Sequence, residues 1–162
     1  DPKTEVGPLI NHNEVNRVEE WVNDAVANGG KILTGGKRIS DSLFEATVIL
    51  NTSDDAIISK NEIFGPVVCL YTYDDIEVAF DRANALDVSF QAAVFTKNID
   101  TALLAVKRLS GTAVMVNDHT AFRVDWMPFG GAKASGLGMG GIHHSMTEMS
   151  KEKLMVLKSP VL

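Results

Sequence analysis

Residues that could do chemistry gather in two short stretches of this 162-residue sequence. In the first stretch, Glu62 and Phe64 stand just ahead of a Gly-Pro turn and an apolar run. In the second, His119, Arg123 and Phe129 lead into a glycine-rich loop that carries one lysine. A guanidinium can hold an anionic group through two hydrogen bonds, and a carboxylate can accept hydrogen bonds from the hydroxyl groups of a sugar. The two stretches therefore predict one wall of a small-molecule site.

Plainer interpretations of the same residues stay open at this level. Glu62 could equally be a surface carboxylate at a turn, and His119 could be a solvated side chain of a polar loop. The glycines at 136, 138 and 141 match the G-x-G-x-x-G spacing, but a dinucleotide fingerprint requires a strand directly before it and a helix directly after it. Because a loop that contains Pro128 precedes these glycines, they indicate tight backbone turns instead.

Neither the cysteine nor the histidines of the chain offer a reaction centre. Cys69, the single cysteine, lies inside the apolar run 67–71, where a thiol is buried and hard to ionise, so we expect a structural role. None of the four histidines stands at metal-ligand spacing from an acidic residue or the cysteine. The sequence thus predicts no catalytic residue and no metal site within this chain.

The composition argues against two classes of partner. The net charge is −6 and no basic run is present, which argues against nucleic-acid binding. No apolar run is long enough to cross a bilayer, so no membrane partner is expected. The first residues lack the layout of a secretory signal, and one cysteine cannot form an internal disulfide. Both features favour a cytoplasmic protein.

The elements that must position these residues follow from the spacing of apolar side chains. Helical spacing predicts helices over 11–27, 74–83 and 100–109, and capping-box patterns mark the starts of the first two, at Asn11 and Asp74. Runs of β-branched and apolar residues predict strands over 31–34, 46–50, 56–59, 67–71, 91–95, 113–116 and 153–158. The continuous run 67–71 is typical of a strand buried on both faces.

Strands and helices alternate through the middle of the chain, which predicts an α/β fold with a mainly parallel sheet. In such sheets, ligands bind at the carboxyl ends of the strands. Asn117 stands at such an end, directly ahead of His119 and Arg123. The fold prediction therefore places the second chemistry-bearing stretch where a ligand site belongs.

Several ordered motifs of the chain resemble the aldehyde dehydrogenase superfamily. They are the segment Thr-Glu-Val-Gly-Pro-Leu-Ile at 4–10, Glu-Ile-Phe-Gly-Pro-Val at 62–67, Ala83-Asn84, Ala-Val-Phe-Thr at 93–96, Val116-Asn117, and Pro-Phe-Gly-Gly at 128–131 with Lys133, Ser135-Gly136 and Gly138. The resemblance runs across nearly the whole chain. It implies a three-layer αβα fold in which residues 1–150 form part of the catalytic domain. It also implies that residues 151–162 form the terminal strand of an oligomerisation sheet, in a homo-oligomer.

The resemblance also implies an activity and roles for named residues. Enzymes of this family oxidise aldehydes to carboxylic acids with NAD or NADP, through a cysteine thiohemiacetal. Glu62 would hydrogen-bond the nicotinamide ribose, Phe64 would pack near the nicotinamide, and Phe129 would line the aldehyde entrance. The family's nucleophilic cysteine, general-base glutamate, oxyanion-stabilising asparagine and dinucleotide-binding domain all precede the segment matched at 4–10. We therefore expect a fragment of an NAD(P)-dependent aldehyde dehydrogenase that is inactive by itself.

One branch of the family matches best in the second stretch. Residues 118–127, and Val88-Ser89-Phe90 in place of the usual Y-G-L, resemble the branch that acts on lactaldehyde and phosphonoacetaldehyde. With His119 and Arg123 at the pocket mouth, a small anionic aldehyde is implied as the substrate. An alternative from a different class stays open: a natural short protein that serves as a non-catalytic binding or assembly module derived from that family.

Overall fold

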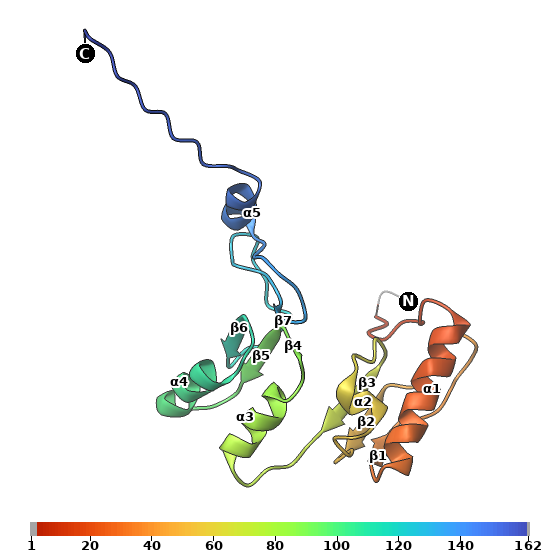
Figure 1. Cartoon of the computed structure of the whole chain (residues 1–162). Helices are drawn as coiled ribbons and strands as arrows, with labels where there is room; N and C mark the ends of the chain where they lie inside the picture. The colour runs from red at the N-terminus through yellow and green to blue at the C-terminus, as the bar shows by residue number, and fades with distance from the viewer. Residues whose placement is uncertain (1–2, 162) are drawn as a thin grey trace. The chain divides into compact units, whose positions relative to one another are not determined.

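The computed structural model describes residues 3–161, and the chain forms two compact units, Asp1–Asp74 and Asp75–Leu162 (Figure 1). Each unit contains helices and one parallel pair of strands. This combination confirms the predicted α/β class. Among the described residues, no helix has the length and apolar character that crossing a bilayer requires.

The first unit is built on a three-stranded sheet with the order β1-β2-β3. Strand β1 (Lys31–Thr34) pairs antiparallel with β2 (Thr47–Leu50), and β2 pairs parallel with β3 (Val67–Leu70). Helix α1 (His12–Ala27) lies beside this sheet (Figure 1). The mixture of one antiparallel and one parallel pairing allows a short connection from β1 to β2 and a longer one from β2 to β3.

Helix α1 begins and ends where the sequence predicts. The side chain of Asn11 accepts hydrogen bonds from the backbone N–H groups of Asn13 (2.9 Å) and Glu14 (3.2 Å), which would otherwise lack partners at a helix start. At the other end, Asn28 is the C-cap and Gly29 follows with φ +90°. A glycine accepts this left-handed conformation without strain, so the helix stops there.

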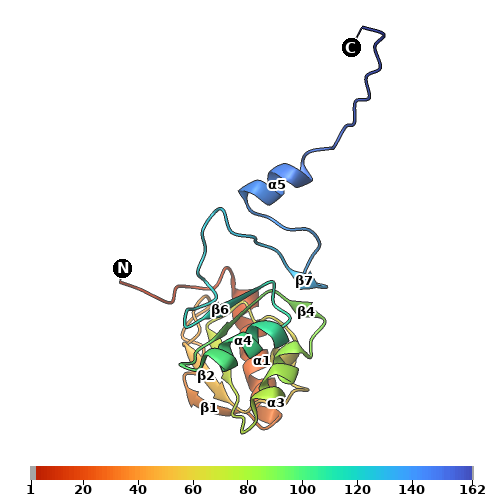
Figure 2. The same cartoon turned by 90° about the vertical axis from the view of Figure 1, so that its left-hand side faces the viewer.

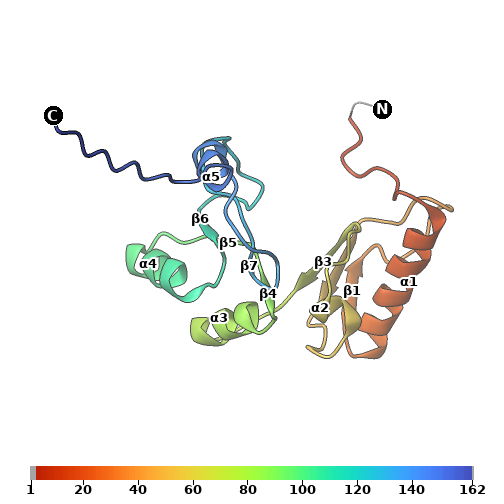
Figure 3. The same ribbon diagram turned by 45° about the horizontal axis from the view of Figure 1, so that its top comes forward.

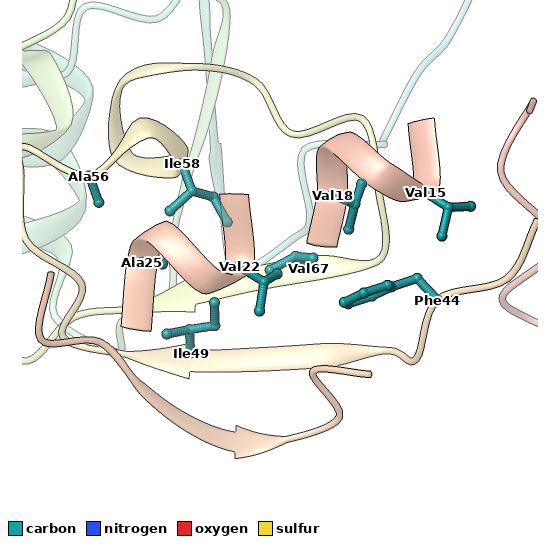
Figure 4. Packing of buried hydrophobic residues seen from close by; sticks show 9 residues of the cluster. All are labelled: Val15, Val18, Val22, Ala25, Phe44, Ile49, Ala56, Ile58 and Val67. Atoms are coloured by element: carbon teal, nitrogen blue, oxygen red, sulfur yellow. The ribbon is translucent and has the colours of Figure 1, made fainter. Parts of the chain in front are cut away.

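The core of the first unit lies between α1 and the sheet. Val15, Val18 and Ile49 are fully buried, and each such side chain contributes about 1.5–3 kcal/mol of apolar burial. Figure 4 shows the valines of α1 directed towards residues of β2, β3 and the preceding loop. The buried cluster consists of Val15, Val18, Val22, Ala25, Phe44, Ile49, Ala56, Ile58 and Val67.

Two predictions about this unit are wrong. The stretch 56–59, predicted as a strand, lies largely in the short helix α2 (Ile57–Lys60), whose first N–H group donates to the carboxylate of Asp24 on α1 at 2.8 Å. Strand β3 is buried on one face only, because Val67 contacts the core whereas Val68 is 57% exposed. In the first unit α1 covers one face of the sheet, so β3 alternates between buried and exposed residues.

The second unit contains two small sheets. Strands β5 (Gln91–Val94) and β6 (Ala113–Val116) pair in parallel, and helix α4 (Ile99–Arg108) connects them (Figure 3). Strands β4 (Val88–Ser89) and β7 (Ala132–Lys133) pair antiparallel. The remaining helices are α3 (Ile76–Asn84) and α5 (Ile142–Glu148).

Helices α3 and α4 are joined by charged side chains. Arg108 on α4 pairs with Glu77 and with Asp81 (3.0 Å) on α3. Helix α3 is capped by Asp75 rather than by Asp74, since the Asp75 side chain accepts from the N–H of Glu77 at 2.9 Å. The predicted capping residue is thus displaced by one position.

After α5 the chain runs on as an extended segment (Figure 2). Residues 151–159 have neither helix nor strand, and the apolar side chains at 154–157 are exposed, Leu154 by 87%. The strand predicted over 153–158 therefore has no pairing partner among the described residues. Its place in an oligomerisation sheet, and the boundary at residue 150, stay predictions.

Candidate functional site

The first part of the candidate site is a strap, residues 62–67, that runs from the end of α2 into β3. Arg17 on α1 donates to the carbonyl oxygen of Ile63 at 2.6 Å, and Pro66 accepts from the N–H of Thr47 at 2.8 Å. A Cβ atom on Gly65 would lie 2.7 Å from a methyl group of Val18, so the glycine lets the strap lie close against α1. The strap is therefore fixed to the core of the first unit from two sides.

The strap presents Glu62 and Phe64 to the outside. Both side chains are exposed, and the Phe64 ring is 73% exposed although it is large and apolar. Phe64 also has φ +42°, a left-handed conformation that costs a non-glycine residue about 1–2 kcal/mol. An exposed ring held on strained backbone indicates a constraint other than packing, which suits the cofactor contact predicted for this residue.

The second part of the candidate site is a cation–aromatic pair in the second unit. The guanidinium carbon of Arg123 lies 3.8 Å from the centre of the Phe129 ring, well within the range of an attractive cation–π contact. Phe129 in turn packs edge-to-face against Phe90, with ring centres 4.9 Å apart and an interplanar angle of 89°. The structure thus brings together two of the predicted substrate-binding residues and adds Phe90, which the sequence offered only as a departure from the family pattern.

Phe129 is held in a closed loop by its own backbone. It donates to the carbonyl oxygen of Gly140 at 3.1 Å and accepts from the N–H of the same residue at 2.7 Å. Across the loop, a Cβ atom on Gly130 would lie 2.7 Å from the carbonyl oxygen of Gly138. The predicted glycines Gly136, Gly138 and Gly141 all have positive φ (154°, 80° and 111°), which agrees with the tight backbone turns expected for them. Strand β7 precedes them, but it pairs antiparallel with β4, whereas a dinucleotide fingerprint opens a βαβ unit.

His119 lies in a turn of its own. Its ring Nδ1 accepts from the N–H of Ala121 at 3.1 Å, and its backbone N–H donates to the carboxylate of Asp118 at 2.8 Å. The ring is exposed, and its Nε2 lies 3.9 Å from the same carboxylate. These bonds orient His119 locally, and its contact with a substrate stays a prediction.

The described residues offer no metal centre, because they contain no group of three or more potential metal ligands. Cys69 is half-buried in β3 and packs against the core of the first unit. That packing suits the structural role predicted for its thiol. The two parts of the candidate site, Glu62 with Phe64 and Arg123 with Phe129, belong to different compact units of the chain.

Comparisons with known proteins agree on one family. The family model described as "Aldehyde dehydrogenase family" matches residues 1–155. The 3-sulfolactaldehyde dehydrogenase of Priestia aryabhattai and the lactaldehyde dehydrogenase of Methanococcus maripaludis are each 40% identical over 157 residues, 97% of this chain and 33% of theirs. The crystal structure of glyceraldehyde-3-phosphate dehydrogenase GapN from Methanocaldococcus jannaschii, complexed with NADP, is 40% identical with a TM-score of 0.87, over 93% of this chain and 32% of that one.

The chain thus spans about a third of the length of the curated relatives it matches. The match between structures extends through both compact units, and the family model covers almost the whole sequence. The order of motifs from residue 4 to residue 138 predicted this outcome. This chain belongs to the aldehyde dehydrogenase family.

Proposed function

We propose that the protein carrying this chain oxidises a small anionic aldehyde to its carboxylic acid with NAD or NADP. In this proposal the chain supplies a cofactor contact, Glu62 with Phe64, and a substrate contact, Arg123 with Phe129. The observation that carries the proposal is the Arg123 guanidinium held over the Phe129 ring, because it places a permanent positive charge beside an aromatic wall.

The residues of the strap fit a nicotinamide cofactor. An exposed carboxylate such as that of Glu62 accepts hydrogen bonds from the paired hydroxyl groups of a ribose. The exposed ring of Phe64 offers an apolar face against which a flat ring packs. When bound, the cofactor supplies the hydride acceptor for oxidation of the aldehyde carbon. The chain's own part is to hold the ribose and restrict the position of the ring.

The charge of Arg123 favours an aldehyde with an anionic tail. Two of the similar proteins are named for such substrates, since 3-sulfolactaldehyde carries a sulfonate and glyceraldehyde 3-phosphate a phosphate. The third is named for lactaldehyde, which is uncharged. A guanidinium can bind a sulfonate, phosphate or carboxylate through two parallel hydrogen bonds. We therefore assign the anionic group of the substrate to Arg123, with His119 as a second donor.

The reacting groups lie outside this chain. Cys69 is half-buried in β3 and packs against the core of the first unit. A nucleophilic thiolate needs access and a basic neighbour, so we assign the thiohemiacetal step to a cysteine of the remaining protein. By itself, the chain is expected to oxidise no aldehyde.

The test compares this chain with the complete protein that contains it, using 3-sulfolactaldehyde and lactaldehyde as a charged and an uncharged substrate of similar size. Reduction of NAD or NADP is measured for the wild-type protein and for Arg123→Met and Arg123→Lys. Loss of a charge-assisted contact of about 1.5–3 kcal/mol raises KM for the charged aldehyde about 10–100-fold in Arg123→Met. KM for lactaldehyde should stay within about twofold. Lys97→Met removes another exposed cation of the second unit and serves as the control.

Three results would contradict the proposal. Oxidation by the isolated chain would mean that Cys69 or another group within it is the nucleophile. An equal effect of Arg123→Met on both aldehydes would mean that Arg123 does not bind the anionic group. A complete protein that oxidises neither aldehyde would leave the non-catalytic binding or assembly module as the better account.

We also propose that the protein is a homo-oligomer that pairs through residues 151–158. The apolar side chains of Leu154, Met155 and Val156 are each at least 80% exposed, and their backbone is extended and unpaired among the described residues. Exposed apolar β-forming segments associate edge to edge. Light scattering should show a mass above that of a monomer, which the paired change Leu154→Glu and Val156→Glu lowers. A clean monomer of the unchanged chain at high concentration would contradict this proposal.

A further inference from the structure

Lys133, in the glycine-rich loop, reaches across to the end of helix α3. Its ammonium donates to the carbonyl oxygen of Asn84 at 2.7 Å and to that of Leu86 at 2.7 Å. Helix α3 ends at Asn84, and the last carbonyl groups of a helix lack donors within the helix and carry partial negative charge. A single cation therefore satisfies one carbonyl oxygen at the end of the helix and a second one two residues beyond it.

The segment around Lys133 is fastened to the same stretch by its backbone. Strand β7 pairs with β4, with Lys133 opposite Val88. Just beyond β7, Ala134 donates to the carbonyl oxygen of Asp87 at 2.8 Å, and Ser135 accepts at its Oγ from the N–H of Ser89 at 2.9 Å. Residues 132–135 are thus fixed in register against residues 84–89.

This register determines where the Phe129 ring lies. Phe90 directly follows β4 and packs against Phe129, which stands three residues before β7. Thr112 links Phe90 to the glycine-rich loop a second time, because its hydroxyl contacts the carbonyl oxygens of Phe90 and of Gly130. Any slip between the two stretches would move Phe129, and with it the contact to Arg123.

The backbone of Lys133 adopts a conformation that is costly for a residue with a side chain. Its φ is +55°, a conformation that glycine adopts freely and other residues adopt at a cost. The loop around it contains several glycines, so a glycine at this position would have been the easier choice for the backbone alone. Strained non-glycine residues persist where their side chain serves the site.

We propose that Lys133 is a positioning residue for Arg123 and Phe129, the pair assigned to the aldehyde. It acts through the backbone of the loop and does not touch the substrate. Its ammonium fixes the glycine-rich loop to the end of α3, and the loop then holds Phe129 beneath Arg123. The link to aldehyde binding rests on the proposed function. The link to the order of the loop does not, because it concerns contacts within the second unit alone.

Amide hydrogen exchange on the full chain tests the structural half of this proposal. The amide of Gly140 donates to Phe129 and reports on the loop. The amide of Asn117 donates to Val94, the last residue of β5, and reports on the rest of the unit. In Lys133→Gln the Gly140 amide should exchange about a hundredfold faster, since two bonds to a charged donor are lost and each shifts the opening equilibrium by about tenfold. The Asn117 amide should be unchanged.

Two further variants separate the side chain from the backbone. Lys133→Arg keeps a cation within reach of the carbonyl oxygens and should restore most of the protection of Gly140. Lys133→Gly removes the strain but also the ammonium, so it should resemble Lys133→Gln. Lys97→Gln, which changes another exposed lysine of the same unit, should leave both amides unchanged.

In the complete protein, Lys133→Gln should raise KM for the anionic aldehyde about tenfold and leave kcat within about twofold, with recovery in Lys133→Arg. Unchanged protection of Gly140 in Lys133→Gln would overturn the proposal. Equal losses at Gly140 and Asn117 would also overturn it, because they would indicate a general loss of stability. If the complete protein oxidises no aldehyde, the proposed function fails while the exchange result still decides whether Lys133 holds the loop.

Discussion

Asn51 and Asn117 occupy equivalent positions at the ends of two parallel strand pairs, one in each compact unit. Each residue follows its strand in a left-handed conformation, with φ 51° and 59°. Each donates its N–H, at 2.8 Å, to the carbonyl oxygen of the last residue of the neighbouring strand. The side-chain oxygen then accepts from the N–H of a threonine two residues further along that neighbour, at 3.1 Å for Asn51 and 2.8 Å for Asn117. The same turn thus closes both pairs.

This shared turn predicts which substitutions at Asn117 lower the free energy of unfolding most. Valine loses the carboxamide bonds and is strained at positive φ, so Asn117→Val should lower the free energy of unfolding of the second unit by about 2 kcal/mol. Asn117→Gly loses only the bonds and should cost about 1 kcal/mol. Denaturant unfolding followed by Trp126, the tryptophan of this unit, measures both. Asn51→Val and Asn51→Gly should give the same order in the first unit, followed by Trp21, and a valine no worse than glycine would refute the equivalence.

Phe64 should be replaceable by glycine with little loss of stability. The ring is 73% exposed and the backbone is left-handed, so relief of about 1–2 kcal/mol of strain offsets the extra chain entropy of glycine. The free energy of unfolding of Phe64→Gly should therefore lie within about 1 kcal/mol of the wild-type value. Phe64→Val keeps a side chain on the left-handed backbone and should be about 1–2 kcal/mol less stable than Phe64→Gly. Urea titration followed by Trp21 decides this. A large loss in Phe64→Gly would show that the ring supports the fold, and the cofactor role would lose its main support.

Ile49 should be the most sensitive position of the first unit. Its side chain projects from β2 and is fully buried against α1 (Figure 4). Ile49→Val should cost about 1 kcal/mol and Ile49→Ala about 3 kcal/mol, because the second change leaves a larger cavity. Val68→Ala, on the exposed face of the neighbouring strand, is the matched control and should stay within about 0.5 kcal/mol. Comparable costs for Ile49→Ala and Val68→Ala would mean that the core lies elsewhere.

The carboxyl group of Asp55 should titrate at unusually low pH. The Lys60 ammonium lies 2.8 Å away and holds the pKa of Asp55 below its ordinary value of 3.8, first by hydrogen bonding and then by charge. Because the folded-state pKa is depressed, the stabilising contribution is present above the unfolded pKa and is lost as the pH falls through the folded value. Carbon-detected NMR titration of Asp55 should show the shift, and Lys60→Gln should abolish it. An unchanged titration curve in Lys60→Gln would assign the shift to another cause.

The sequence predicted the elements whose signals are local and repeated. Helix α1 shows both a regular apolar stripe and a capping residue at Asn11, and its limits were found almost to the residue. Strands β4 and β7 are two residues each, too short for any periodicity, and were not predicted. The first N–H group of the helix at Ile57 donates to the carboxylate of Asp24, which is far away in the sequence. The local run of apolar residues contains no sign of this bond and suggested a strand instead.

The candidate site was predictable in its members but not in its geometry. The residue type singled out Arg123 and the family resemblance singled out Phe129, yet their contact depends on a loop without periodicity. The third member of the cluster, Phe90, comes from a separate strand end and has no pattern that links it to Phe129. The left-handed backbone of Phe64 and of Lys133 is likewise a feature that the local propensities of phenylalanine and lysine do not predict.

Lys133 binds its two partners through their carbonyl oxygens, which every amino acid carries. The anchor therefore makes no demand on the side chain of Leu86. The side chain of Asn84, the other partner, is held separately, because it bonds to the backbone of Arg108 and Ser110. Mutational drift can alter the side chain at position 86 freely while the lysine stays fixed. Across related sequences, a constant lysine should face a variable partner, so covariation would not reveal this contact.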